Sequence, residues 1–125
     1  MNNSKKILVG EDSSVILNLT RSILSFEKYQ MKAAKNGKQV LDILEKEDFD
    51  LILMDLNMPV LDGATCTKMI RELNDETKSK LPIIAITGNM NNYTMDEFRK
   101  MGFDDFIQKP LDYDRLLATV KKFLV

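Results

Sequence analysis

Short apolar runs alternate with amphipathic segments along the whole chain. In the clearest run, residues 51–54 carry four large apolar side chains that lead directly into Asp55 and then, past a short turn, to Pro59. A run this short without polar alternation is typical of a strand buried on both faces, as in a parallel sheet. Proline cannot donate to a ladder, so the strand ends before Pro59. We therefore expect Asp55 at the carboxyl end of a central strand, the edge where open α/β sheets bind ligands.

Four further apolar runs are predicted as strands of the same sheet: residues 7–10, 30–34, 82–87 and 105–108. Apolar residues at helical spacing predict five helices, which end near residues 26, 47, 73, 101 and 124. The apolar positions assigned to the first helix are Val15, Ile16, Leu19, Ile23 and Phe26, and those of the third are Cys66, Met69, Ile70 and Leu73. Residues 74–80 are predicted to form a polar connection.

The pattern of a strand followed by a helix occurs five times. Alternation at this spacing predicts right-handed βαβ units and a parallel sheet covered by helices on both faces. We therefore expect an α/β fold, (βα)5, with a five-stranded parallel sheet. The chain of 125 residues has no linker, low-complexity run or internal repeat, so we expect one domain over residues 1–125 with its core from about residue 5 to residue 125.

Composition narrows the classes of function. The net charge of -1 gives no long-range attraction to nucleic acid or to an anionic membrane. No apolar run approaches the ~20 residues that span a bilayer, and the first residues lack the apolar stretch of a signal peptide, so we expect a cytoplasmic protein. Cys66 is the single cysteine, which excludes an internal disulfide. The chain has no histidine, which excludes imidazole catalysis and a phosphohistidine within the chain.

Reactive side chains follow four of the predicted strands where they end. These are Glu11 with Asp12, Asp55, Thr87 and Lys109. Parallel strands bring these ends to one edge of the sheet. Clustered carboxylates are ligands for a hard divalent ion such as Mg²⁺, and a carboxylate can also act as a nucleophile toward phosphorus. Phosphoryl transfer further needs positive charge and donors at the phosphoryl oxygens, which the ammonium and the hydroxyl could supply.

Four motifs at these strand ends resemble the receiver domains of two-component response regulators, whose fold is CheY-like or flavodoxin-like. They are Gly10-Glu11-Asp12, Met54-Asp55-Leu56-Asn57-Met58-Pro59 with Asp62-Gly63, Ile86-Thr87-Gly88, and Lys109-Pro110-Leu111. Each motif is weak alone, but all four occur in order and the resemblance covers essentially the whole chain. It implies that Asp55 accepts a phosphoryl group. It also implies that Asp12, Asp55 and the backbone carbonyl of Asn57 bind Mg²⁺, with Glu11 acting through water.

The resemblance also assigns roles at the other strand ends. It implies that Thr87 hydrogen-bonds the phosphoryl group and that Lys109 pairs with it. Phe106 occupies the position of the family's switch aromatic, and Lys109-Pro110 matches its usual cis peptide. Two positions depart from the common pattern: Glu11 replaces the commoner Asp, and Gly88 follows Thr87 where a small residue is usual.

The resemblance implies a signalling switch that is not a metabolic enzyme. A partner histidine kinase or histidine phosphotransfer protein would supply the phosphoryl group, because the chain has no histidine to carry one. The output would be binding of a downstream protein, or self-dimerisation, through the helix that ends near residue 101, the last strand and the last helix. No effector domain follows Val125, so we expect a stand-alone receiver or a piece of a longer chain.

Three other functions stay open. An aspartate-nucleophile phosphatase would need an acid two residues after Asp55, where this chain has Asn57. A nucleotide or flavin binder would need a glycine-rich cradle after the first strand, where Glu11 and Asp12 would repel phosphates. A receiver that works unphosphorylated as a binding module is disfavoured by the intact Asp55, Thr87 and Lys109.

Overall fold

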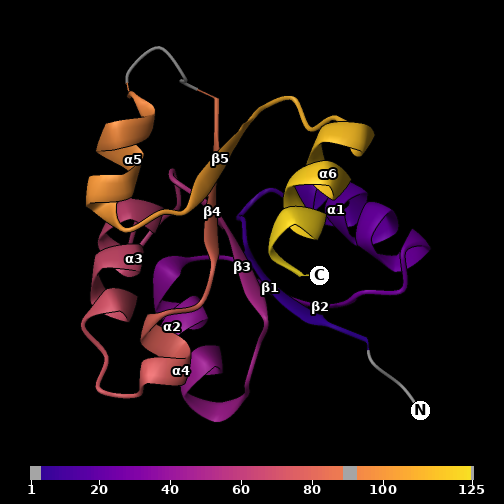
Figure 1. Cartoon of the computed structure of the whole chain (residues 1–125). Coiled ribbons are helices and arrows are strands. Elements are labelled where there is room, and N and C mark those ends of the chain that lie inside the picture. The colour runs from indigo at the N-terminus through magenta and orange to yellow at the C-terminus, as the bar shows by residue number, and fades with distance from the viewer. Residues whose placement is uncertain (1–3, 89–92, 125) are drawn as a thin grey trace.

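One five-stranded parallel sheet forms the centre of the computed structural model, which describes residues 4–88 and 93–124 (Figure 1). Its strands are β1 (Lys6–Gly10), β2 (Gln30–Ala34), β3 (Leu51–Asp55), β4 (Ile83–Thr87) and β5 (Asp105–Gln108). Their order in the sheet is β2-β1-β3-β4-β5, so β3 lies in the middle. All residues of β3 are buried, as its unbroken apolar run predicted. The predicted α/β fold is confirmed.

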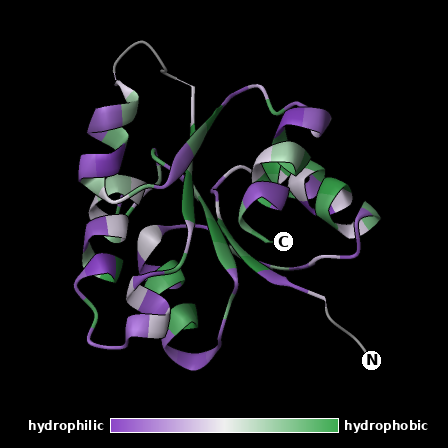
Figure 2. Cartoon of the chain, in the orientation of Figure 1, coloured by the Kyte–Doolittle hydropathy of each residue, from purple (hydrophilic) through white to green (hydrophobic). Residues whose placement is uncertain are grey.

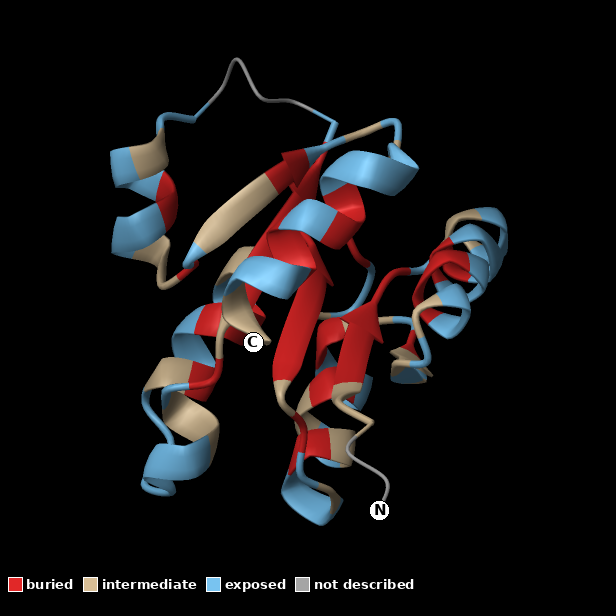
Figure 3. Ribbon diagram, turned by 45° about the vertical axis from the view of Figure 1, so that its right-hand side comes forward, coloured by how far each residue is buried: buried red, intermediate tan, exposed pale blue. Residues whose placement is uncertain are grey.

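Helices cover both faces of this sheet. In the described ranges they are α1 (Ser14–Phe26), α2 (Gly37–Lys46), α3 (Gly63–Arg71), α4 (Glu76–Ser79), α5 (Met95–Met101) and α6 (Tyr113–Phe123). Helices α1 and α6 lie on one side of the sheet, and the other helices lie on the opposite side (Figure 1). Ile52 and Met54 pack in the core beneath α2, α3 and α5, while Leu51 and Leu53 pack in the core beneath α1 and α6. The three central strands β1, β3 and β4 are accordingly the most apolar and most buried elements, whereas the edge strands β2 and β5 are only partly buried (Figures 2 and 3).

Helix α4 was not predicted, because its sequence has no apolar period. It lies within the segment expected to be a polar connection. The Asp75 side chain caps it by accepting a hydrogen bond from the Thr77 backbone, and Arg71 Nη1 donates to the Ser79 carbonyl at 2.8 Å. Polar capping and one guanidinium therefore stabilise this turn of helix. None of the helices in the described part of the chain is long and apolar enough to cross a membrane.

The predicted inward faces of α1 and α3 were partly wrong. The apolar residues that are exposed despite the prediction are Val15, Leu19 and Phe26 in α1, with Met69 in α3 and Leu73 just after it. The buried positions of α1 are Leu17, Thr20, Ile23 and Leu24. Apolar residues surround much of α1, so helical spacing alone could not decide which stripe faces the sheet.

Candidate functional site

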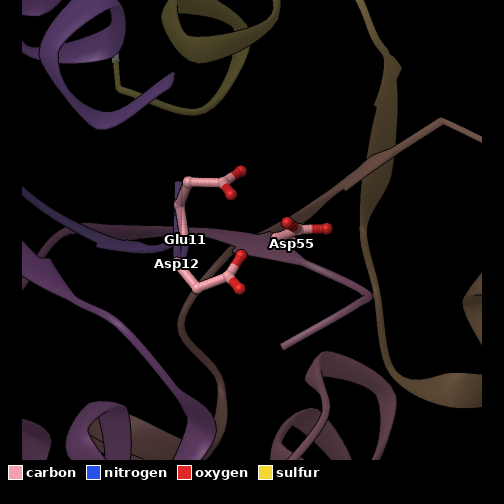
Figure 4. Close-up of side chains that lie close together, drawn as sticks. All are labelled: Glu11, Asp12 and Asp55. Atoms are coloured by element: carbon pink, nitrogen blue, oxygen red, sulfur yellow. The ribbon is translucent and has the colours of Figure 1, made fainter. Parts of the chain in front are cut away.

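Three carboxylates gather at the carboxyl edge of the sheet. Strands β1 and β3 are neighbours with Gly10 opposite Met54, so the residues that follow them lie side by side. One carboxylate oxygen from each of Glu11, Asp12 and Asp55 lies within 4.8 Å of the other two (Figure 4). The crossover topology therefore brings together acids that are more than forty positions apart in the sequence.

Asp55 is the buried centre of this cluster, with 2% of its surface exposed. Its Oδ1 accepts a hydrogen bond from the Asn57 backbone N–H at 3.0 Å. Its Oδ2 accepts one from Lys109 Nζ at 3.1 Å. One ammonium and one backbone dipole thus stabilise the carboxylate, and they hold its orientation at the end of β3.

Glu11 is as deeply buried, with 1% exposed, but it is less well satisfied. Its Oε2 accepts a hydrogen bond from the Ser13 backbone N–H at 3.1 Å. Its Oε1 has no hydrogen-bond donor among the described residues, although Lys109 Nζ lies 3.3 Å away. Burial, together with the nearby charge of Asp55, raises the pKa of Glu11 to about 7 despite the opposing effects of Ser13 and Lys109. Asp12 is exposed beside this pair.

Lys109 connects the acids to the end of β4. Its backbone N–H donates to the Thr87 carbonyl at 2.8 Å, and the Lys109–Pro110 peptide bond is cis. Burial lowers the pKa of the Lys109 ammonium, but the hydrogen bond and charge of Asp55, with Glu11, outweigh burial and raise it overall. Thr87 is buried at the end of β4, and a side chain at Gly88 would meet open space.

Gly63 has a role that the motif analysis missed. A Cβ atom at this position would overlap the carbonyl oxygen of Asp55, because the start of α3 packs directly on the end of β3. The Gly63 N–H donates to the Leu56 carbonyl at 3.0 Å and fixes this approach. The Asp62-Gly63 pair is part of the motif that follows β3, but the resemblance assigned Gly63 no role of its own. A glycine at the first position of a helix was the signal for close backbone approach.

Two of the predicted residues contribute no side chain to the acidic cluster. Phe106 lies within β5, where its ring stacks on Phe98 of α5. Asn57 has an exposed side chain, and its backbone N–H points to Asp55. The proposed part of the Asn57 carbonyl in metal binding stays a prediction.

The donor set fits a hard cation. Glu11, Asp12 and Asp55 each place a carboxylate oxygen within 4.8 Å of the other two, and Glu11 Oε1 is buried without a hydrogen-bond donor in the described ranges. Lys109 is the one cation that contacts the acids within the described residues. Oxygen donors with excess negative charge are what Mg²⁺ prefers. The same edge thus combines a buried carboxylate, two further acids and one ammonium.

Residues 7–121 match the family described as the response regulator receiver domain. The chain belongs to this family. Receiver domains are signalling modules of two-component and phosphorelay systems. This receiver is 37% identical over 116 residues to the CAI-1 autoinducer sensor kinase/phosphatase CqsS of Vibrio cholerae; the match covers 93% of the receiver and 17% of the kinase. The receiver spans about a fifth or less of the length of the curated relatives it matches.

Solved structures agree with the assignment. The receiver is similar to chemotaxis response regulator CheY4 of Vibrio cholerae, with a TM-score of 0.88, 26% identity and coverage of 98% and 100% of the two chains. It is also similar to the receiver domain of a sensor histidine kinase of Pseudomonas aeruginosa, with a TM-score of 0.87, 28% identity and coverage of 97% and 98%. That structure has a magnesium ion coordinated in its active site cleft. The predicted CheY-like fold and family are confirmed.

Proposed function

We propose that this receiver, acting as one domain over residues 1–125, accepts a phosphoryl group on Asp55. A carboxylate oxygen attacks phosphorus of a phosphohistidine on a partner. The new P–O bond forms as the P–N bond breaks, and the electron pair goes to the imidazole nitrogen of the partner. The observation that carries this proposal is the Asp55 carboxylate, buried at the sheet edge between the acidic cluster and the Lys109 ammonium at 3.1 Å.

The acids are proposed to hold Mg²⁺ in this reaction. Asp12, Asp55 and the backbone carbonyl of Asn57 would bind it, and Glu11 would act through water. Bound Mg²⁺ would neutralise negative charge on the phosphoryl oxygens. The magnesium site of the Pseudomonas receiver and the unsatisfied oxygen of Glu11 support this assignment.

Lys109 and Thr87 are proposed to stabilise the phosphorylated form of Asp55, and Phe106 is proposed to change its position in response. The Lys109 ammonium would transfer its contact from the carboxylate to a phosphoryl oxygen, and the Thr87 hydroxyl would donate to another. Phe106 would then rotate toward Thr87 and change the surface formed by α5, β5 and α6, through which a downstream protein or a second copy binds. Phe106 has no hydroxyl, so burial of its ring leaves no donor unpaired.

The phosphodonor is proposed to be a histidine kinase or a histidine phosphotransfer protein that docks over α1. A hollow of about 420 Å³ beside Lys109 is lined by Ile16, Leu19, Pro110 and Leu111. Val15 is 78% exposed on the same helix. Apolar residues gathered this close to a reactive site favour a protein partner. This would place the donor imidazole near Asp55.

We propose no turnover of an external substrate. Asn57, two residues after the nucleophile, cannot protonate a leaving group, which a phosphatase of the aspartate-nucleophile class would require. Hydrolysis of a small phosphoester by the purified protein would contradict this and would favour the phosphatase.

Phosphorylation with a small donor tests the acceptor. Acetyl phosphate or phosphoramidate with Mg²⁺ should add one acid-stable, base-labile phosphoryl group, which mass spectrometry should locate on Asp55. Asp55→Asn should remain unmodified. Asp48→Asn, a matched change of an exposed carboxylate before β3, should react like the wild type. Phosphorylation of the Asp55→Asn variant at another residue would contradict the proposal.

A further inference from the structure

Phe98 lies at the centre of an aromatic cluster that joins α5 to β5. It is the one buried residue of α5. Its ring centroid lies 5.1 Å from that of Phe106, with the planes 21° apart, so the two rings stack. Tyr93 packs against Phe98 at 5.4 Å, and Phe103 makes an edge contact at 6.1 Å. The position of α5 therefore depends strongly on this ring.

The stack competes with the movement expected of Phe106. In the sheet, Phe106 lies opposite Ala85, and Thr87 follows two residues later on the same face of β4. Ala85 belongs to the core beneath α5, and the partly buried Phe106 packs against that core. We expect a Phe106 ring that turns toward Thr87 to give up its stacking contact with Phe98.

We propose that Phe98 is a positioning residue of the switch, whose ring holds Phe106 in its resting position and couples its release to α5. This inference rests on the proposed phosphorylation switch and adds a residue that the family motifs do not include. A stacked aromatic pair favours the stacked state by roughly two- to tenfold in population. Any ligand that stabilises the switched state must overcome this bias, which lowers its apparent affinity by the same factor.

Binding of beryllofluoride, an analogue of the phosphoryl group, measures that factor. NMR titration in Mg²⁺ should show that Phe98→Leu binds the analogue roughly two- to tenfold more tightly than the wild type. Phe103→Leu is the matched control: it removes an equally buried ring that touches Phe98, and the described contacts do not place it against Phe106. Both variants lose core packing, but only Phe98→Leu should change the affinity.

A second substitution of Phe98 and a double variant with Phe106 distinguish coupling between these two rings from a general loss of folding stability. Phe98→Met keeps an apolar side chain without a flat ring, so it should reproduce the tighter binding if Phe98→Leu does not fold. In a Phe106→Leu background, the Phe98 substitution should no longer alter the affinity. Equal affinities of wild type, Phe98→Leu and Phe98→Met would overturn the inference alone, whereas a wild type that does not bind beryllofluoride would overturn the proposed function together with it.

Discussion

Glu11 carries the least satisfied charge of the acidic cluster. Burial raises its pKa from 4.5 to about 7, although Lys109 Nζ lies 3.3 Å away. A raised pKa means that folding disfavours the ionised form. Its protonated form therefore stabilises the metal-free native state at low pH, and this stabilisation is lost as the pH rises through about 7.

Substitution of Glu11 by Gln should remove this pH dependence. In EDTA, the free energy of unfolding of the wild type should fall, relative to that of Glu11→Gln, as the pH rises from about 4.5 to about 7. The fall should be at most roughly 3 kcal/mol, because each pKa unit corresponds to ~1.4 kcal/mol. Urea unfolding at several pH values measures it. A difference between the two proteins that stays constant across this range would show that burial does not affect the Glu11 carboxyl.

The positions of some site residues could be predicted from the sequence, whereas the contacts of others could not. Asp55, Thr87 and Lys109 could be placed together, because each ends a predicted parallel strand. The unsatisfied oxygen of Glu11 could not be predicted, since it depends on the direction in which Lys109 Nζ approaches. The stack of Phe98 on Phe106 also escaped prediction, because it joins a helix and a strand whose relative position only the tertiary structure defines.

The loop between β3 and α3 contains a strained turn beside the site. Val60 has φ 70°, and the Leu61 N–H donates across it to the Pro59 carbonyl at 2.7 Å. This is a γ-turn with a left-handed central residue, which is rare and strained. A β-branched side chain is the least suited to that conformation. The Val60 side chain is 79% exposed, so it contributes little packing in return.

Val60→Gly should therefore stabilise the protein. Relief of roughly 1–2 kcal/mol of left-handed strain outweighs the ~0.4–1 kcal/mol cost of greater freedom in the unfolded chain. The net gain should be about 0.5–1 kcal/mol, which raises Tm by a few degrees. Val60→Ala keeps a Cβ atom and should gain less. A lower melting temperature of Val60→Gly in calorimetry would mean that Val60 is not strained.

The boundaries of the strands were predicted more reliably than the side of each helix that faces the sheet. The strands agree with the prediction to within one residue at each end, because each is a short apolar run with few alternatives. The inward face of α1 was partly wrong, because Val15, Leu19 and Phe26 form a second apolar stripe at helical spacing. Within this stripe, Leu19 lines the hollow beside Lys109, and an exposed apolar residue there is not required for folding. This hollow coincides with the surface proposed for the phosphodonor.

At the scale of the whole molecule, the acidic cluster links metal binding to stability. Mg²⁺ has a proposed site in the folded chain and no comparable site in the unfolded chain, so it should stabilise by RT ln(1 + [L]/Kd). At tenfold excess over Kd the gain is about 1.4 kcal/mol. The melting temperature should rise by about 3–6 °C in a domain of this length. Thermal unfolding with and without millimolar Mg²⁺ measures the shift.

The variants Asp12→Asn and Asp48→Asn test whether the stabilisation by Mg²⁺ comes from binding at the acidic cluster or from a general effect of salt. Asp12 makes no hydrogen bond or ion pair in the described ranges, so Asp12→Asn removes one negative charge and one proposed ligand with little structural loss. In EDTA it should melt at or above the wild-type temperature, because repulsion within the cluster falls. In Mg²⁺ it should lose most of the rise. Asp48→Asn carries the same charge change away from the cluster and should keep the full response. Loss of repulsion should raise the stability of Asp12→Asn in EDTA, whereas loss of a ligand should reduce its gain in Mg²⁺. An equal loss of stability in both buffers would show that Asp12 is a structural residue and not a metal ligand.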